Sequence, residues 1–212
     1  MTAPPSAAGG ISATYLLVVL LSAAFTDNIL LTRFLGLCSF LAVSKQLKAA
    51  VGLGLAVLFV TTGTCAINAA LYRYALVPAH EAFGVPLGMQ LILFIVVIAG
   101  FVQLLEMIVE RVSLGLYYAL GIFLPLVTVN CAILGACLFL VNLDLGVADG
   151  TMFGFGSGLG WMLAIIAMAG IRAKLQSARV PAGLEGPGIT LIITGIMALA
   201  FIGFSGMVQL AR

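Results

Sequence analysis

Residues 11–43 read ISATYLLVVLLSAAFTDNILLTRFLGLCSFLAV, and the apolar character of this run is interrupted at Thr26-Asp27-Asn28 and at Arg33. As one straight helix the run would be about 50 Å long. The hydrocarbon core of a bilayer is only about 30 Å thick. The run therefore predicts a membrane-spanning helix that is broken near its middle.

A second over-long apolar run extends from Val112 to Val141 and contains Pro125 near its middle. Proline removes a helical hydrogen bond and clashes with the preceding turn. Interrupted spans at matching places in two halves of a chain are typical of discontinuous helices that meet at a midplane site. We therefore expect broken first and fourth helices, with Asp27, Asn28, Pro125 and Asn130 at the breaks or along an ion path.

The rest of the chain is equally apolar. Of its 212 residues, 63% are hydrophobic and 8% are charged, whereas about 25% of the residues in soluble proteins are charged. This composition excludes a soluble globule, and a disordered chain would need the opposite composition. The net charge of +2 gives no indication of a nucleic-acid partner.

Charge-free segments indicate the number of spans. Six long segments contain no Lys, Arg, Asp or Glu: residues 1–26, 49–72, 82–105, 112–143, 150–171 and 186–211. Each can hold the roughly 20 helical residues that cross a bilayer, and in lipid an open chain satisfies its backbone hydrogen bonds only as a helix. We expect an all-α polytopic membrane protein with six transmembrane helices, forming a single membrane domain over residues 1–212.

Basic residues predict the orientation, because they are enriched in cytoplasmic loops. The loops after the second and fourth spans and the C-terminal end carry only Arg73 and Arg212. The loops after the first, third and fifth spans carry six basic residues, Lys45, Lys48, Arg111, Arg172, Lys174 and Arg179. We therefore expect these odd-numbered loops in the cytoplasm and both termini outside. The first ten residues contain no Lys or Arg, so we expect the first span to be retained rather than cleaved as a signal peptide.

The two halves of the chain, about 11–111 and 112–210, resemble each other weakly. Residues 34–38, FLGLC, correspond to residues 127–131, VTVNC, and the Gly-Leu-Gly at 52–54 corresponds to that at 158–160. With three spans in each half, the second half is inverted relative to the first. The pattern predicts an inverted 3+3 repeat. The alternative is a chance match, because glycine and leucine are common in membrane helices.

Cysteines occur at positions 38, 65, 131 and 137. Cys38 and Cys131 each follow a predicted break at equivalent repeat positions, so the repeat would bring them to similar depth near the membrane centre. A thiolate in lipid is costly unless a metal takes up its charge, and an iron–sulfur cluster needs four cysteines. The pair could be half of such a set, completed by another chain. Alternatively, each cysteine is a small buried residue. Cys65 has no repeat partner, and Cys137 lies on a different helical face from Cys131.

Other polar and glycine-rich features have simpler interpretations. The glycines of residues 154–160 predict close helix packing rather than a phosphate loop or an ion filter. Glu106 and Glu110, beside Arg111, indicate pairing at the membrane interface, or alternatively a cation entrance. Asp27 and Arg33 could pair with each other or with a partner chain. We assign no role to His80.

Both cysteine segments resemble those of one known family. Residues 34–45, FLGLCSFLAVSK, and 120–132, LGIFLPLVTVNCA, are similar to segments in a family that comprises the E subunit of sodium-translocating NADH:quinone oxidoreductases and the A subunit of Rnf complexes. The similarity extends from about residue 15 to the C-terminus. Residues 101–111, 153–164 and 186–190 are closer to the NADH:quinone oxidoreductase branch, whereas Arg33 with residues 34–38 is closer to the Rnf branch.

The resemblance implies a specific function. Members of this family pair with a homologous membrane protein of opposite orientation in the bacterial inner membrane. The two chains share one 2Fe–2S cluster, two cysteines from each, which here would be Cys38 and Cys131. The cluster passes electrons across the membrane, with flavins only on other subunits, and electron flow drives Na⁺ or H⁺ transport.

We expect the NADH:quinone oxidoreductase branch, in which electrons pass from NADH to quinone and drive Na⁺ transport, and three alternatives stay open. An Rnf protein would use ferredoxin and NAD⁺ in place of NADH and quinone. A non-redox inverted-repeat transporter would contain no iron. A purely structural membrane subunit would tolerate replacement of its cysteines.

Overall fold

A computed structural model describes residues 13–78, 88–112, 124–176, 181 and 183–203. In these residues the chain is helical, without strands, as the composition predicts. Their helices are α1 (Ala13–Leu21) with the π-helical η1 (Ser22–Thr26), α2 (Leu37–Val43), α3 (Leu47–Leu71) with the π-helical η2 (Tyr72–Leu76), α5 (Met89–Val112), α7 (Leu124–Thr128), α8 (Cys131–Asn142), α9 (Val147–Leu175) and α10 (Pro187–Ile202). His80, Arg179, Arg212 and both termini lie outside the described residues.

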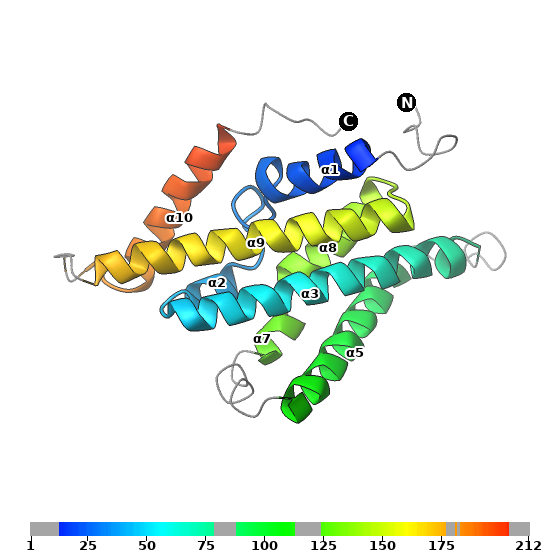
Figure 1. The fold of residues 1–212 in the computed structure, drawn as a ribbon, viewed down its shortest axis with the longest axis horizontal. Coiled ribbons are helices and arrows are strands. Elements are labelled where there is room, and N and C mark those ends of the chain that lie inside the picture. The colour runs from blue at the N-terminus through cyan, green and yellow to red at the C-terminus, as the bar shows by residue number, and fades with distance from the viewer. Residues whose placement is uncertain (1–12, 79–87, 113–123, 177–180, 182, 204–212) are drawn as a thin grey trace.

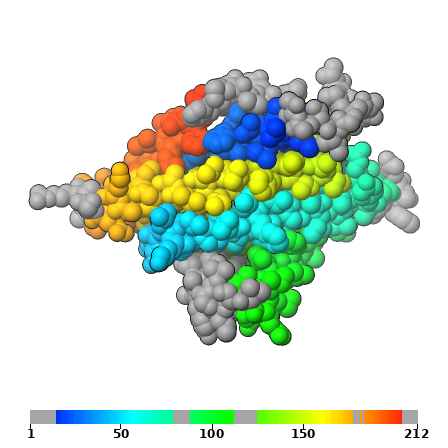
Figure 2. Space-filling model, in the orientation of Figure 1, coloured from blue at the N-terminus to red at the C-terminus, as the bar shows by residue number. Residues whose placement is uncertain are grey.

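The long helices α3 and α9 lie side by side at the centre of the protein (Figure 1). Gly154 on α9 faces Cys65 on α3, while Gly158, one turn further along α9, faces Leu58, two turns back along α3. The two helices are therefore antiparallel. A Cβ at Gly154 would lie 2.6 Å from Cβ of Cys65, and one at Gly158 would lie 2.9 Å from Cα of Leu58. These glycines permit close packing, as predicted from residues 154–160, and Figure 2 shows the resulting tight seam.

A second face of α9 packs against α1 and η1. A Cβ at Gly156 would lie 2.7 Å from the carbonyl oxygen of Leu20, and one at Gly160 would lie 2.5 Å from that of Ala24. The glycine run therefore lets α9 approach α3 on one side and the first helix on the other. The central position of α9 follows from this double contact.

Four helices in the described residues are long and apolar enough to cross a membrane: Leu47–Leu76, Met89–Arg111, Pro125–Asn142 and Val147–Leu175. Two shorter apolar helices, Tyr15–Thr26 and Pro187–Ile202, lie in the first and last charge-free segments. The structure thus shows an apolar helix at each of the six predicted positions. Four of these helices reach spanning length within the described residues.

The ends of α2 and α9 are joined by Arg172. Its Nη1 donates to the carbonyl oxygen of Leu41 at 3.1 Å and to Oγ of Ser44 at 2.8 Å. These acceptors lie at the C-terminal end of α2, where carbonyl groups lack helical partners. The contact places the C-terminal ends of α2 and α9 on the same side of the protein. Basic residues that we expect in the cytoplasm lie at or beside both ends.

Candidate site at the two helix breaks

The first break separates η1 from α2. Residues 27–36 form turns, and helix resumes at Leu37. Phe34 and Gly36 adopt left-handed backbone conformations, with φ of +55° and +82°. At Gly36 a side chain would also clash, since its Cβ would lie 2.5 Å from Nε1 of Trp161. Glycine is therefore required at the point where the chain re-enters a helix.

Asn28 fixes this break against α9. Its buried amide donates from Nδ2 to the carbonyl oxygens of Ala24, at 3.1 Å, and Gly160, at 2.9 Å. Its Oδ1 accepts from the backbone N–H groups of Leu30 and Leu31. The side chain thus replaces backbone hydrogen bonds that are lost where the helix ends. Its predicted position at the break is observed, and its contacts are those of a structural residue.

The second break lies at Val129 and Asn130, between α7 and α8. Pro125 is the second residue of α7, so the interruption lies about one turn beyond the proline that suggested it. Asn130 is extended and caps α8, because its side chain accepts from the N–H of Ala132 at 3.0 Å. Asparagine is among the preferred residues at this cap. The cap, rather than the proline, marks where the helix restarts.

The two breaks meet. The backbone N–H of Gly36 donates to Sγ of Cys131 at 2.9 Å. Nδ2 of Asn130 donates to Oγ of Ser39 at 3.3 Å, and that hydroxyl donates to the carbonyl oxygen of Gly36 at 3.1 Å. Cys38 is the second residue of α2, and Cys131 is the first residue of α8. Both cysteines are free and exposed. Each of the two helix restarts at this crossing therefore carries an exposed thiol.

This setting suits a sulfur atom that carries negative charge. A backbone N–H donor and the first turn of α8 both stabilise an anion, as a metal-bound thiolate requires. Among the described residues, no group of three or more His, Cys, Asp and Glu side chains gathers to hold a metal. In this part of the chain the crossing carries two cysteines, so a site with four sulfur ligands would need a second chain.

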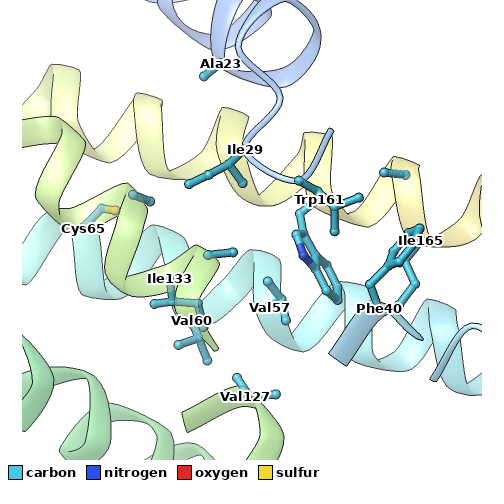
Figure 3. Close-up of a cluster of buried hydrophobic side chains, with 14 of the residues drawn as sticks. Ala23, Ile29, Phe40, Val57, Val60, Cys65, Val127, Ile133, Trp161 and Ile165 are labelled. Carbon is cyan, nitrogen blue, oxygen red and sulfur yellow. The ribbon is translucent and has the colours of Figure 1, made fainter. Parts of the chain in front are cut away.

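Cys65 and Cys137 form a different pair, which the repeat pattern did not predict. Their sulfur atoms lie 3.9 Å apart between α3 and α8, and Nδ2 of Asn68 donates to Sγ of Cys137 at 3.2 Å. Both are free thiols with 0% exposure, and Figure 3 shows Cys65 among buried apolar side chains. Their individual interpretation as small buried residues is confirmed. Their proximity depends on helix packing, for which the sequence carried no signal.

The remaining predicted residues lie apart from the thiols or at the surface. Asp27 is exposed beside the first break. Among the described residues Arg33 forms no ion pair with Asp27. Its guanidinium instead lies 4.8 Å from the ring centroid of Phe139 on α8, in a cation–π contact. Glu106 is half-buried on α5, and Glu110 is exposed one turn further on. The structure places neither acid at the crossing of the breaks.

Comparison with known proteins gives close matches over most of the chain. A family model described as "Rnf-Nqr subunit, membrane protein" matches residues 16–208. A protein of Serratia proteamaculans is 54% identical over 186 residues, which are 87% of this chain and 94% of the relative. Proteins of Aeromonas hydrophila and Aeromonas salmonicida are each 50% identical, over 89% and 90% of this chain and 96% and 97% of their own lengths. All three relatives are named as the E subunit of a "Na(+)-translocating NADH-quinone reductase".

Proposed function

Because this chain belongs to the Rnf-Nqr family of membrane-protein subunits, we propose that it acts as the E subunit of a sodium-translocating NADH:quinone reductase. Identity of 50% or more with relatives of that name, along nearly their whole length, supports this assignment. The same names favour it over the Rnf alternative, the A subunit of a ferredoxin:NAD⁺ oxidoreductase. On this proposal the chain is one part of a translocase and catalyses nothing alone.

The proposed architecture is an inverted 3+3 repeat of six spans in the bacterial inner membrane. Repeat one covers about 11–111 and repeat two about 112–210, with both termini outside. Support comes from the antiparallel packing of α3 and α9, which occupy equivalent places in the two halves. A break in the first span of each half also supports it. The Arg172 contact agrees with the predicted orientation.

The proposed site is half of a 2Fe–2S cluster, with Cys38 and Cys131 as ligands. The observation that carries this proposal is the exposure of these two thiols at the crossing of the breaks, while the other two cysteines are buried. The remaining two ligands would come from a homologous membrane subunit of opposite orientation. Bound there, the cluster would accept and release single electrons, and flavins would be carried only by other subunits.

The protein residues would hold and shield this centre. The Gly36 N–H stabilises negative charge on Cys131, and buried Trp161 and Phe40 keep water from the inner side of the crossing. One electron added to a cluster inside the membrane would change the local charge by one unit. Nearby charges respond strongly to such a change where screening is weak. That change would attract Na⁺ and shift the broken helices between inward-open and outward-open states.

The proposed ion path avoids the residues that define the breaks. Asn28 and Asn130 are occupied by hydrogen bonds that define the breaks, and Pro125 lies within α7. Asp27, which is exposed beside the first break, is the residue we propose as a contact for the ion. Glu106, near the expected cytoplasmic end of α5, is proposed as part of its entrance.

Electron paramagnetic resonance of the purified complex tests this function. NADH should generate a reduced-cluster signal, ubiquinone should remove it, and Na⁺ should accelerate its removal. A complex without iron would overturn the proposal in favour of a non-redox transporter. A signal that forms with reduced ferredoxin but not with NADH would show an Rnf protein instead.

A further inference from the structure

Trp161 is the single tryptophan of the chain and is fully buried on α9, with 0% exposure. Within the described part of the chain, its indole Nε1 has no hydrogen-bond partner. A buried donor without an acceptor costs roughly 1–3 kcal/mol, and nearly all buried polar groups in native proteins are paired. The unpaired N–H therefore indicates an acceptor that the described part of this chain does not provide.

The indole nitrogen lies at the crossing of the breaks. A Cβ built on Gly36 would lie 2.5 Å from Nε1 of Trp161 and 2.9 Å from Oδ1 of Asn130. Figure 3 shows the nitrogen on the edge of the ring that faces Ile133 of α8, on the opposite side from Phe40. The backbone N–H of Gly36, beside this nitrogen, is the one that donates to Sγ of Cys131.

The nearby acceptor is already engaged. Oδ1 of Asn130 accepts the N–H of Ala132 at 3.0 Å as the cap of α8, and no bond joins it to Trp161. Gly36 leaves the space between the indole and the crossing free of a side chain. The N–H of Trp161 is thus an unused donor beside Gly36, whose own N–H donates to Sγ of Cys131.

Resting on the proposed function, we propose that Trp161 is a hydrogen-bond donor to the sulfur atoms of the cluster and raises its reduction potential. Hydrogen bonds to cluster sulfurs are one of the factors that set this potential. A reduced cluster carries one more negative charge than an oxidised one, so a donor stabilises the reduced state more. Gly36 acts in the same direction through its backbone, and its lack of a side chain admits the indole.

Replacement of the indole tests the proposal in the assembled complex. Trp161→Phe removes the N–H and keeps an aromatic ring. The cluster signal should persist, while its midpoint potential falls by an amount equivalent to about a tenfold lower equilibrium constant for reduction, or about 59 mV for one electron. Ile165→Val is the matched control, since this buried neighbour one turn along α9 loses a methylene but leaves the indole intact. Its midpoint should equal that of the wild type.

A second variant separates the hydrogen bond from packing. A benzothiophene analogue of tryptophan, incorporated at position 161 alone, keeps the shape of the indole and lacks the N–H. A midpoint lowered in this variant supports the proposal even if Trp161→Phe fails to assemble. A wild-type midpoint in the analogue would overturn it and leave the proposed function intact. Absence of a cluster signal from the wild-type complex would instead overturn the proposed function, and this inference with it.

Discussion

The chain contains two pairs of cysteines in contrasting environments. Cys38 and Cys131 lie where two broken helices restart, and both thiols are exposed. Cys65 and Cys137 lie inside continuous helices, and both are fully buried. Residue type alone therefore does not distinguish the two pairs. They differ in whether the helix around the thiol is broken and whether the thiol is exposed.

Each environment follows from local interactions. At the buried pair, Asn68 donates to Cys137, and Gly154 brings α9 against Cys65. At the exposed pair, a backbone N–H donates to Cys131, and no other metal-ligating group gathers there among the described residues. The buried thiols thus have their contacts within this chain. We propose that the exposed thiols are two of four cluster ligands and that a partner chain supplies the other two.

The largest expected effect comes from removing an exposed thiol. Cys38→Ala or Cys131→Ala should each abolish electron transfer from NADH to quinone, because a missing ligand prevents cluster assembly. Turnover of the purified complex measures this effect. Cys65→Ala is the matched control and should retain turnover. Normal turnover in both exposed-thiol variants would remove the functional distinction between the two pairs.

The second-largest effect is a loss of stability, expected when the packing that supports the first break is disturbed. Gly160→Ala places a Cβ 2.5 Å from the carbonyl oxygen of Ala24 and 2.9 Å from Nδ2 of Asn28. Overpacking of this kind costs about 1–3 kcal/mol, measurable by denaturant titration of the protein in detergent micelles. Gly170→Ala, on the same helix with nothing within 4 Å of its Cβ, should leave stability unchanged. Equal effects of the two changes would refute the close approach.

A smaller loss of stability is expected from a change at the second break. Asn130→Ala removes the cap of α8 and the bond to Ser39, and loss of such a cap costs about 1 kcal/mol. The same titration measures it. Ser39→Ala removes only the connection between the breaks, so it should destabilise the protein less. A larger loss in Ser39→Ala than in Asn130→Ala would contradict the role of Asn130 as a cap.

The smallest effect is expected within the buried pair. Cys65→Ala removes one sulfur atom from a closely packed site, and a typical destabilisation of about 1 kcal/mol or less is expected. The reduction potential of the cluster should not change, because this thiol lies among apolar side chains away from the crossing. A redox titration of the complex checks this point, and a shifted midpoint would show that the two pairs are coupled.

The sequence predicted the features that depend on neighbouring residues along the chain. The length of residues 11–43 and their interruption at Asn28 indicated the first break, because helix length and bilayer thickness are fixed. The second break lies beyond Pro125, because the cap at Asn130 decides where α8 begins. The Cys65–Cys137 contact and the position of Trp161 arise from helix packing, which no local pattern encodes.

Iron analysis combined with electron paramagnetic resonance of the assembled complex tests the central claim most directly. The wild type and Cys65→Ala should contain the cluster shared with the partner chain. Cys38→Ala and Cys131→Ala should each lose both its iron and its signal. Retention of the cluster in both of these variants would contradict the claim that the crossing of the two breaks holds it.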